Sequence, residues 1–138
     1  MARVLIVPCG CRGRALAREL RAAGHAVRGT TRGAHTTDIA EAGAEPYIGD
    51  PDRIATLMEA LHGVTVVCWL AGTIDIPDGR LRMFWEKIVD TGVRGVVHEG
   101  AGEAIARASA ETWQIPLELV RVGDPVADAV ARLLQPAH

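Results

Sequence analysis

The sequence of 138 residues contains few cysteines, no long apolar run and no large excess of either charge. Three cysteines, an odd number, do not form a disulfide framework and are typical of proteins in a reducing compartment. No apolar stretch approaches the length of a membrane span, and the N-terminus carries no signal-peptide pattern. We therefore expect a cytoplasmic protein that does not bind membranes.

The net charge of −2 argues against a nucleic-acid partner, because charged residues of both signs are spread along the chain and no basic region is available for phosphates. The length predicts one domain spanning residues 1–138, since 49% hydrophobic residues are enough for a core. A separate substrate domain does not fit within this length.

The most informative segment is residues 1–24. Residues 3–7 form an apolar, β-branched run that is typical of a buried strand, and residues 14–23 carry leucines at helical spacing. Gly10 and Gly13, between them, have the spacing of the last two glycines of a dinucleotide-binding fingerprint, with the helix N-terminus facing the phosphates. The turn thus contains four residues expected to bind a cofactor: Gly10, Cys11, Arg12 and Gly13.

This opening resembles the short-chain dehydrogenase superfamily, especially its epimerase/dehydratase-like and NmrA-like branches, whose first turn reads G-x-x-G-x-x-G or G-x-G-x-x-G. The resemblance implies a doubly wound parallel sheet and a nicotinamide dinucleotide. The sequence departs from both patterns, because Val7 and Pro8 occupy the positions of the first glycine. Proline has no amide hydrogen, so the turn offers one phosphate donor fewer. A strand-to-helix connection without any ligand is the alternative interpretation.

The end of the second predicted strand, residues 26–30, bears on the choice of cofactor. NAD-selective Rossmann proteins carry an acidic residue here for the ribose 2′-hydroxyl, whereas this chain has Thr31 and Arg32. An arginine at this place is the usual partner of a 2′-phosphate. Together with Arg12 it predicts NADP rather than NAD, and the alternative is an arginine that is merely solvated.

Asp50 follows the third predicted strand, residues 45–48. In epimerase-like proteins an acidic residue here flanks the adenine and accepts from its amino group, so the resemblance implies that Asp50 binds the cofactor. Asp50 before Pro51 is also typical of a helix N-cap, and residues 54–61 have the apolar spacing of an amphipathic helix. The two roles are compatible.

The ends of the fourth and fifth predicted strands complete the expected site. Ala71 and Gly72 follow the fourth strand, where the family has a small-residue turn beside the nicotinamide-side ribose. The family places a catalytic serine or threonine after the fifth strand, and this chain has His98 and Glu99 there. A histidine and a carboxylate at a crevice can transfer protons, and the alternative is a histidine that is packed and hydrogen-bonded.

Tyrosine and lysine are nearly absent. Classical members of the family use a Tyr-x-x-x-Lys pair after the fifth strand, but Tyr47 and Lys87 are the only tyrosine and lysine of this chain and are forty residues apart. The sequence therefore predicts no ordinary ketone-reductase or sugar-epimerase turnover.

Two further features have open interpretations. The predicted helix over residues 79–91 has an apolar, aromatic face that is wider than one sheet face needs, and Met83 lies off it. This width favours a homodimer or a thick core.

Cys9 and Cys11 suggest a redox or metal pair, but no second pair of metal ligands accompanies them, so small residues lining a glycine turn are the simpler interpretation.

Six strands alternating with six helices predict an α/β fold, a Rossmann sheet of order 3-2-1-4-5-6. Three functions are compatible with this sequence. The first is a nucleotide-binding or redox-sensing module that binds NADP(H) and signals to a protein partner, as NmrA-like proteins are thought to do. The second is a small NADP-dependent oxidoreductase whose site a partner or dimer mate completes. The third is a cofactor-free scaffold.

Overall fold

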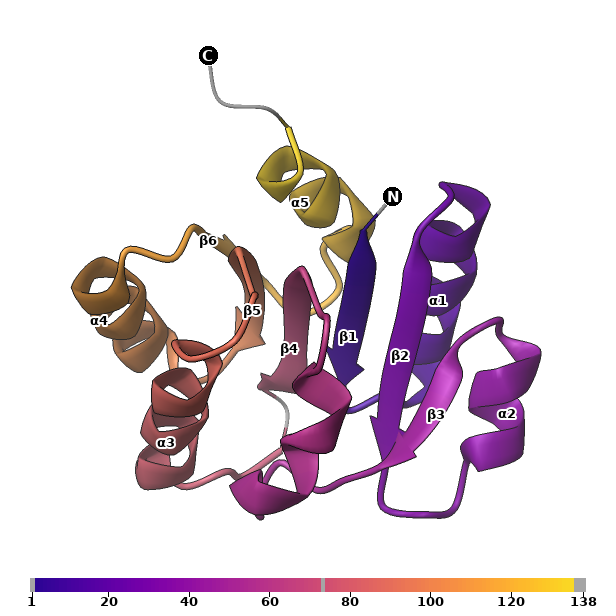
Figure 1. Cartoon of the computed structure of the whole chain (residues 1–138), viewed down its shortest axis with the longest axis horizontal. Coiled ribbons are helices and arrows are strands. Elements are labelled where there is room, and N and C mark those ends of the chain that lie inside the picture. The colour runs from indigo at the N-terminus through magenta and orange to yellow at the C-terminus, as the bar shows by residue number, and fades with distance from the viewer. Residues whose placement is uncertain (1, 73, 136–138) are drawn as a thin grey trace.

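The structure is a computed structural model that describes residues 2–72 and 74–135. Six strands form one sheet in the order β3-β2-β1-β4-β5-β6, and every neighbouring pair is parallel, as predicted (Figure 1). The strands are β1 (Arg3–Val7), β2 (Ala26–Thr31), β3 (Glu45–Ile48), β4 (Val66–Gly72), β5 (Gly95–Gly100) and β6 (Leu117–Val120). The α-helices are α1 (Cys11–Ala22), α2 (Thr36–Glu41), α3 (Asp78–Ile88), α4 (Glu103–Trp113) and α5 (Val126–Leu133), and two 3-10 helices, η1 (Ile54–Leu57) and η2 (Glu59–Leu61), connect β3 to β4.

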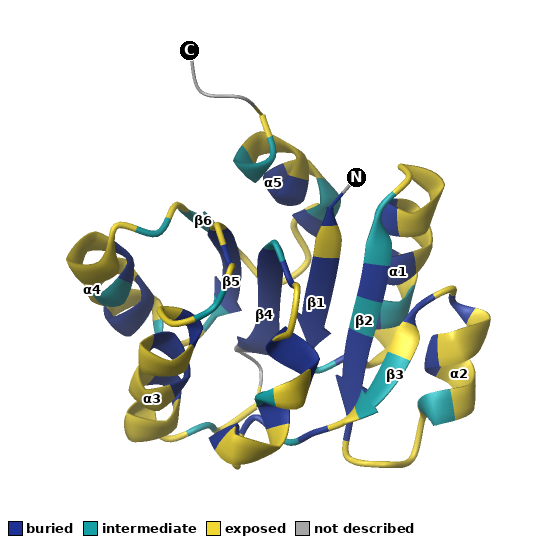
Figure 2. Ribbon diagram, in the orientation of Figure 1, coloured by how far each residue is buried: buried dark blue, intermediate teal, exposed yellow. Residues whose placement is uncertain are grey.

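The central strands are buried on both faces, because helices cover both sides of the sheet (Figure 2). Successive residues of β1 point to opposite sides: Val4 and Ile6 pack with α1, α2 and α5, whereas Leu5 and Val7 pack with η1, η2 and α3. This alternation divides the hydrophobic core into two layers, one on each face of the sheet.

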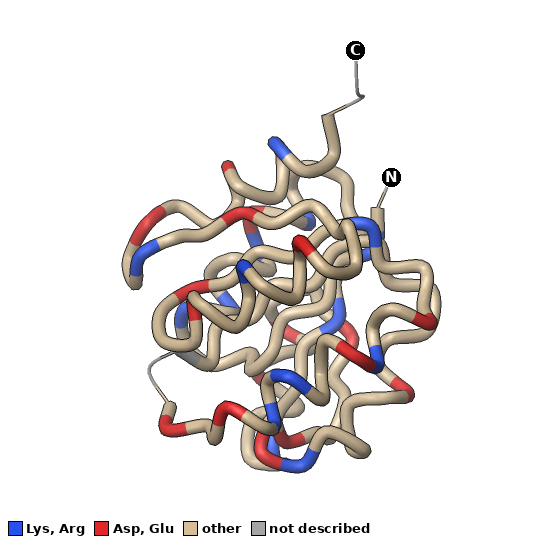
Figure 3. Tube along the Cα trace, turned by 90° about the vertical axis from the view of Figure 1, so that its left-hand side faces the viewer, with Lys and Arg blue, Asp and Glu red and all other residues tan. Residues whose placement is uncertain are grey.

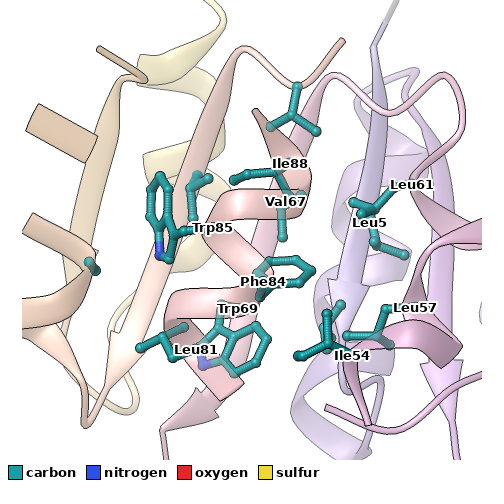
Figure 4. Close-up of a cluster of buried hydrophobic side chains, with 14 of the residues drawn as sticks. Leu5, Ile54, Leu57, Leu61, Val67, Trp69, Leu81, Phe84, Trp85 and Ile88 are labelled. Carbon is teal, nitrogen blue, oxygen red and sulfur yellow. The ribbon is translucent and has the colours of Figure 1, made fainter. Parts of the chain in front are cut away.

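The aromatic face of α3 is part of the core. Phe84 lies 5.0 Å from the ring of Trp69 on β4, with the two rings tilted by 41°. Trp85 is 1% exposed and belongs to the same buried cluster as Ile105 of α4 (Figure 4). Helix α3 thus packs both on the sheet and on α4, and this thick core explains why its apolar face is wide. Met83 lies outside the buried cluster and is 40% exposed.

The prediction of one amphipathic α-helix over residues 54–61 is wrong, since this segment forms the two 3-10 helices. The Thr56 hydroxyl explains the difference. It donates to the Arg53 carbonyl at 2.6 Å and accepts from the Asp50 amide at 2.8 Å, so it competes with regular helical hydrogen bonding. Asp50 does not cap a helix either, because the first 3-10 helix begins only at Ile54 with Arg53 as its N-cap; the Asp50 carboxylate accepts from the Asp52 amide at 2.9 Å in a local turn.

The two edge strands, β3 and β6, have four residues each, and β3 contains Pro46. Acidic and basic residues are interspersed along the trace in the view of Figure 3. Within the described residues, no helix has both the length and the apolar character that crossing a bilayer requires.

Candidate functional site

The glycine turn lies where the chain leaves β1 and enters α1, at the carboxyl ends of the parallel strands. It begins with a cis peptide bond between Val7 and Pro8. The Cys9 amide then donates to the Thr30 carbonyl at 2.8 Å, which holds the turn against β2. In an open parallel sheet, ligands bind in the crevice beyond these strand ends.

The two glycines of the turn differ in what surrounds them. A side chain at Gly13 would meet Ile6 Cγ2 and the Pro8 carbonyl oxygen, each at 3.1 Å, so this glycine allows α1 to pack closely on β1. Among the described residues, no atom lies within 4 Å of the position where a Cβ of Gly10 would lie. A ligand therefore has open space next to the Gly10 backbone. Gly29 of β2 lies beneath the turn, where a Cβ would be 2.6 Å from Cys9.

The N-terminus of α1 has the properties of an anion site. Gly10 is its N-cap, no side chain caps it, and its first turn contains no acidic residue. The first amides of a helix lack partners within the helix and carry partial positive charge, which attracts phosphate. A pocket of about 200 Å³ borders this end of the helix and is lined by Pro8, Gly10, Cys11, Arg12, Gly13, Leu70 and Ile74.

The two cysteines of the turn have different surroundings. Cys9 is buried, and this burial raises the pKa of its thiol to about 11, although the nearby positive charge of Arg14 opposes the shift. Cys11 is exposed and lines the pocket at the helix N-terminus. One thiol is thus protonated and packed against Gly29, while the other faces solvent. Within the described part of the chain, no group of three or more His, Cys, Asp or Glu residues could hold a metal ion.

The residues predicted to bind the adenosine end lie together at the ends of β2 and β3. Arg32 Nη2 is 3.4 Å from Asp50 Oδ1, and the two side chains are 64% and 23% exposed. Thr31 is buried and its hydroxyl accepts from the Gly33 amide at 3.3 Å. The lack of an acidic residue at the end of β2 therefore does not leave Arg32 without a carboxylate, because Asp50 reaches it from the segment after β3.

Arg12 has a partner that the sequence does not suggest. Its Nη2 lies 2.6 Å from Oε1 of Glu99, whose side chain is 1% exposed, while that of Arg12 is 44% exposed. The contact is an ion pair without hydrogen-bond geometry. Because the two residues are 87 positions apart in the chain, only the strand order brings them together.

His98 and Glu99 are adjacent in β5 but face opposite sides of the sheet. The His98 ring lies near Gly102 and Leu81, on the α3 side, whereas Glu99 reaches Arg12 of α1. His98 Nε2 is 2.8 Å from the Ala101 carbonyl oxygen and donates to it. Its Nδ1 is buried without a partner, and burial lowers its pKa, so the ring is neutral near pH 7. The two residues therefore do not form one proton-transfer pair.

The small residues Ala71 and Gly72, expected after the fourth strand, are the last two residues of β4. Ala71 is buried and lines a cavity of about 50 Å³, together with Ala101 and Gly102 from the loop after β5. The Gly72 backbone pairs with Gly100 in the sheet. The expected role of these small residues, which is to let the nicotinamide-side ribose of a dinucleotide lie close, stays a prediction.

Arg14 is a residue that sequence reasoning missed. Its Nη1 atom is buried and has no hydrogen-bond partner among the described residues, and its charge acts on the Cys9 thiol. The only signal in the sequence is an arginine directly after the glycine turn. The three arginines thus differ in environment: Arg12 is paired with a buried carboxylate, Arg32 with a partly exposed one at the ends of β2 and β3, and Arg14 has no acidic partner within the described residues.

Comparison with known proteins identifies the fold. Neither a protein-family model nor a curated protein sequence matches the chain. The triphenylmethane reductase of Citrobacter sp., solved with NADP(H), superposes with a TM-score of 0.70 at 16% identity, over 88% of this chain and 49% of the reductase. UDP-glucuronic acid 4-epimerase of Bacillus cereus, solved with NAD, superposes with a TM-score of 0.67 at 13% identity, over 88% of this chain and 55% of the epimerase.

The chain thus spans about half the length of these enzymes. Two of its structural neighbours are thus a reductase solved with NADP(H) and an epimerase solved with NAD, in agreement with the resemblance of the glycine turn. At these identities the comparison establishes the architecture, and the protein has the Rossmann fold that these enzymes share.

Proposed function

We propose that the protein binds NADP(H) along the glycine turn and acts as a redox-sensing module. The observation that carries the proposal is the uncapped N-terminus of α1, which opens beside Gly10 onto free space. Cofactor phosphates at this end gain the amides of the first helical turn. The adenosine would extend over β2 toward Arg32, and the nicotinamide would extend over β4 and β5.

NADP(H) is favoured over NAD(H) through Arg32. A 2′-phosphate has close to two negative charges, so an arginine gains charge-assisted hydrogen bonds that a ribose hydroxyl does not offer. Asp50 weakens this preference, since the phosphate has to displace it from Arg32. The pair is exposed and exposed pairs contribute only about 0–1 kcal/mol, so a preference of about tenfold is still expected.

A sensing role is favoured over catalysis by two observations. The chain contains no tyrosine and lysine at Tyr-x-x-x-Lys spacing, and His98 and Glu99 face opposite sides of the sheet. A lone, neutral histidine whose Nε2 already donates to a carbonyl does not replace the missing pair. We expect no NADPH-dependent turnover of a carbonyl panel by the purified chain.

Titration of the purified protein with NADPH, NADP⁺, NADH and NAD⁺ by calorimetry tests the proposal. We expect the phosphorylated cofactors to bind about tenfold more tightly, and Arg32→Ala to abolish this difference while the affinity for NAD(H) is retained. Arg94→Ala is the matched control, since Arg94 is an exposed arginine that precedes β5 at the opposite end of the sheet. Absence of binding by all four nucleotides would show that the protein is a cofactor-free scaffold.

Alkylation of Cys11 gives a second, site-specific measurement. Cys11 is exposed at the expected phosphate site, whereas Cys9 and Cys68 are buried. Burial raises the pKa of both buried thiols, so iodoacetamide should modify one cysteine in the native protein and three in denaturant. Bound NADPH should slow modification of Cys11, and an unchanged rate would place the cofactor elsewhere.

We also propose that the protein forms a homodimer through the outer face of α3. Met83 and Val89 are 40% and 36% exposed, and they leave apolar area in water beside the buried aromatic residues. Met83→Glu should convert a dimer into a monomer in sedimentation equilibrium, while Arg82→Glu, a charge change at an exposed neighbour, should have less effect. A wild-type monomer at high micromolar concentration would contradict this proposal.

A further inference from the structure

Two cavities continue from the glycine-turn pocket toward the β4 and β5 ends. One lies between α1 and the loop before α5, has a volume of about 220 Å³, and shares Arg12 and Leu70 with the glycine-turn pocket. The other, of about 50 Å³, lies beside α3 and shares Ile74 with it. A nicotinamide ring whose phosphates lie at the α1 N-terminus has to enter one of these two spaces. The larger one offers more room and is bordered by Glu99, so we call it the Glu99 pocket.

The charges that line the Glu99 pocket favour a cationic occupant. Arg12 is the one cationic side chain among its described lining residues, against the three carboxylates Glu19, Glu99 and Asp124. Asp124 is engaged by the Arg121 amide at 3.1 Å, and Glu19 is exposed. Glu99 differs from both, because it is almost fully buried and its Oε1 atom has no hydrogen-bond partner within the described part of the chain. A buried carboxylate without a hydrogen bond requires a positive charge beside it.

Arg12 supplies that charge in the absence of a ligand, and it is placed so that a cofactor can draw it away. It lies in the first turn of α1, it is 44% exposed, and it lines both the glycine-turn pocket and the Glu99 pocket. A pyrophosphate at the helix N-terminus offers the guanidinium charge-assisted contacts in the first of these pockets. When Arg12 turns to the phosphate, the charged side chains that remain among the described lining residues of the Glu99 pocket are all carboxylates.

We propose that the nicotinamide ring enters the Glu99 pocket, and that Glu99 makes the protein bind NADP⁺ more tightly than NADPH. The oxidised ring carries a positive charge and replaces the charge that Arg12 withdraws, whereas the reduced ring is neutral and leaves Glu99 uncompensated. This inference rests on the proposed binding of NADP(H). It gives the sensing role a physical basis, because one buried carboxylate then distinguishes the two redox states of the cofactor.

The test compares dissociation constants for NADP⁺ and NADPH in the wild type, in Glu99→Gln and in the control Glu111→Gln. Glu111 is an exposed glutamate of α4, far along the chain from the pocket lining. We expect the wild type and the control to bind NADP⁺ about tenfold more tightly than NADPH or better. Glu99→Gln should reduce this ratio to near one, mainly by weakening the binding of NADP⁺.

Equal wild-type affinities for the two redox states would overturn the inference while leaving the proposed NADP(H) binding intact. A ratio that persists in Glu99→Gln would also overturn it. If Glu99→Gln does not fold, the Arg12→Met/Glu99→Leu double variant, which replaces the ion pair by apolar side chains, provides the same comparison and should also give a ratio near one. Failure of the wild type to bind any nucleotide would refute the inference together with the proposed function.

Discussion

Two arginine–carboxylate pairs lie beyond the carboxyl ends of the strands, one at the glycine turn and one at the ends of β2 and β3, and they differ in the burial of the carboxylate. Arg12 and Glu99 are 2.6 Å apart, with the carboxylate side chain 1% and the arginine side chain 44% exposed. Arg32 and Asp50 are 3.4 Å apart, with the arginine 64% exposed. Removing the partner of a buried charge typically costs about 3–5 kcal/mol, whereas an exposed pair contributes about 0–1 kcal/mol.

This difference separates two kinds of functional arginine. Arg12 cannot leave Glu99 unless another positive charge takes its place, so its movement is coupled to the ligand. Arg32 can exchange Asp50 for a phosphate at little cost. Arg12 thus contributes both to the stability of the fold and to the site, whereas Arg32 contributes to the site alone.

The largest expected effect comes from breaking the buried pair. Arg12→Met should lower the free energy of unfolding by about 3 kcal/mol, because Glu99 then stays buried without a positive charge. Urea denaturation monitored by tryptophan fluorescence measures this loss. Arg18→Met is the matched control on the exposed face of α1 and should change stability by less than about 0.5 kcal/mol. If Arg12→Met and Arg18→Met lowered the free energy of unfolding equally, the pairing of Arg12 with the buried Glu99 would contribute no more than an exposed arginine does.

The packing beneath the turn should matter almost as much. Gly29→Ala places a Cβ 2.6 Å from the Cβ and Sγ of Cys9, and we expect about 2 kcal/mol of destabilisation from this overpacking. Gly10→Ala meets no atom within 4 Å and should change stability by less than about 1 kcal/mol. It should nevertheless weaken cofactor binding, since its methyl group occupies the space left for the phosphates. The pair of variants therefore separates a glycine needed for folding from one needed for binding.

His98 predicts a dependence of the protein's stability on pH. Burial lowers its pKa below the usual value of 6.5, so at mildly acidic pH the unfolded chain binds a proton that the folded protein does not. The free energy of unfolding should therefore decrease as the pH falls below about 6.5. His98→Gln should flatten this slope, and His62→Gln, at an exposed position, should retain it. A slope unchanged in His98→Gln would assign the pH dependence to other groups.

The smallest effect on stability is expected for the exposed pair. Asp50→Asn retains an Oδ1 acceptor for the Asp52 amide and removes only the charge that faces Arg32. We expect the free energy of unfolding to change by less than about 0.5 kcal/mol and the affinity for NADP⁺ to rise about threefold. Calorimetric titration measures this gain, and NAD⁺ is the internal control. A loss of NADP⁺ affinity would mean that Asp50 itself binds the cofactor, as the family resemblance implies.

Most of the fold follows from local sequence patterns. The β-branched runs at β1 and β4 and the glycine turn before α1 predict the strand order correctly, because right-handed crossovers leave few alternatives. Residues 54–61 are the exception, since their apolar spacing suits an α-helix while the Thr56 hydroxyl favours tighter turns. A hydrogen bond between one side chain and the backbone changes the helix type without changing the periodic pattern.

The site was predictable only in outline. Gly10 and Gly13 stand out because their spacing reflects local backbone geometry. The Arg12–Glu99 pair and the burial of the Arg14 Nη1 atom arise only in the folded sheet. They depend on which strand ends become neighbours and on the direction that each side chain takes there. His98 and Glu99 illustrate the same limit, since residues that are adjacent in a strand face opposite sides of a sheet.

The edge strands have a consequence for how copies of this protein can associate. Edge strands present unpaired backbone groups on which another chain can add a strand, and short or proline-containing edges suppress this addition. β3 and β6 have four residues each, and Pro46 removes one donor from β3. Extension of the sheet into fibrils and exchange of strands between molecules are therefore disfavoured, and self-association is left to the helical surfaces.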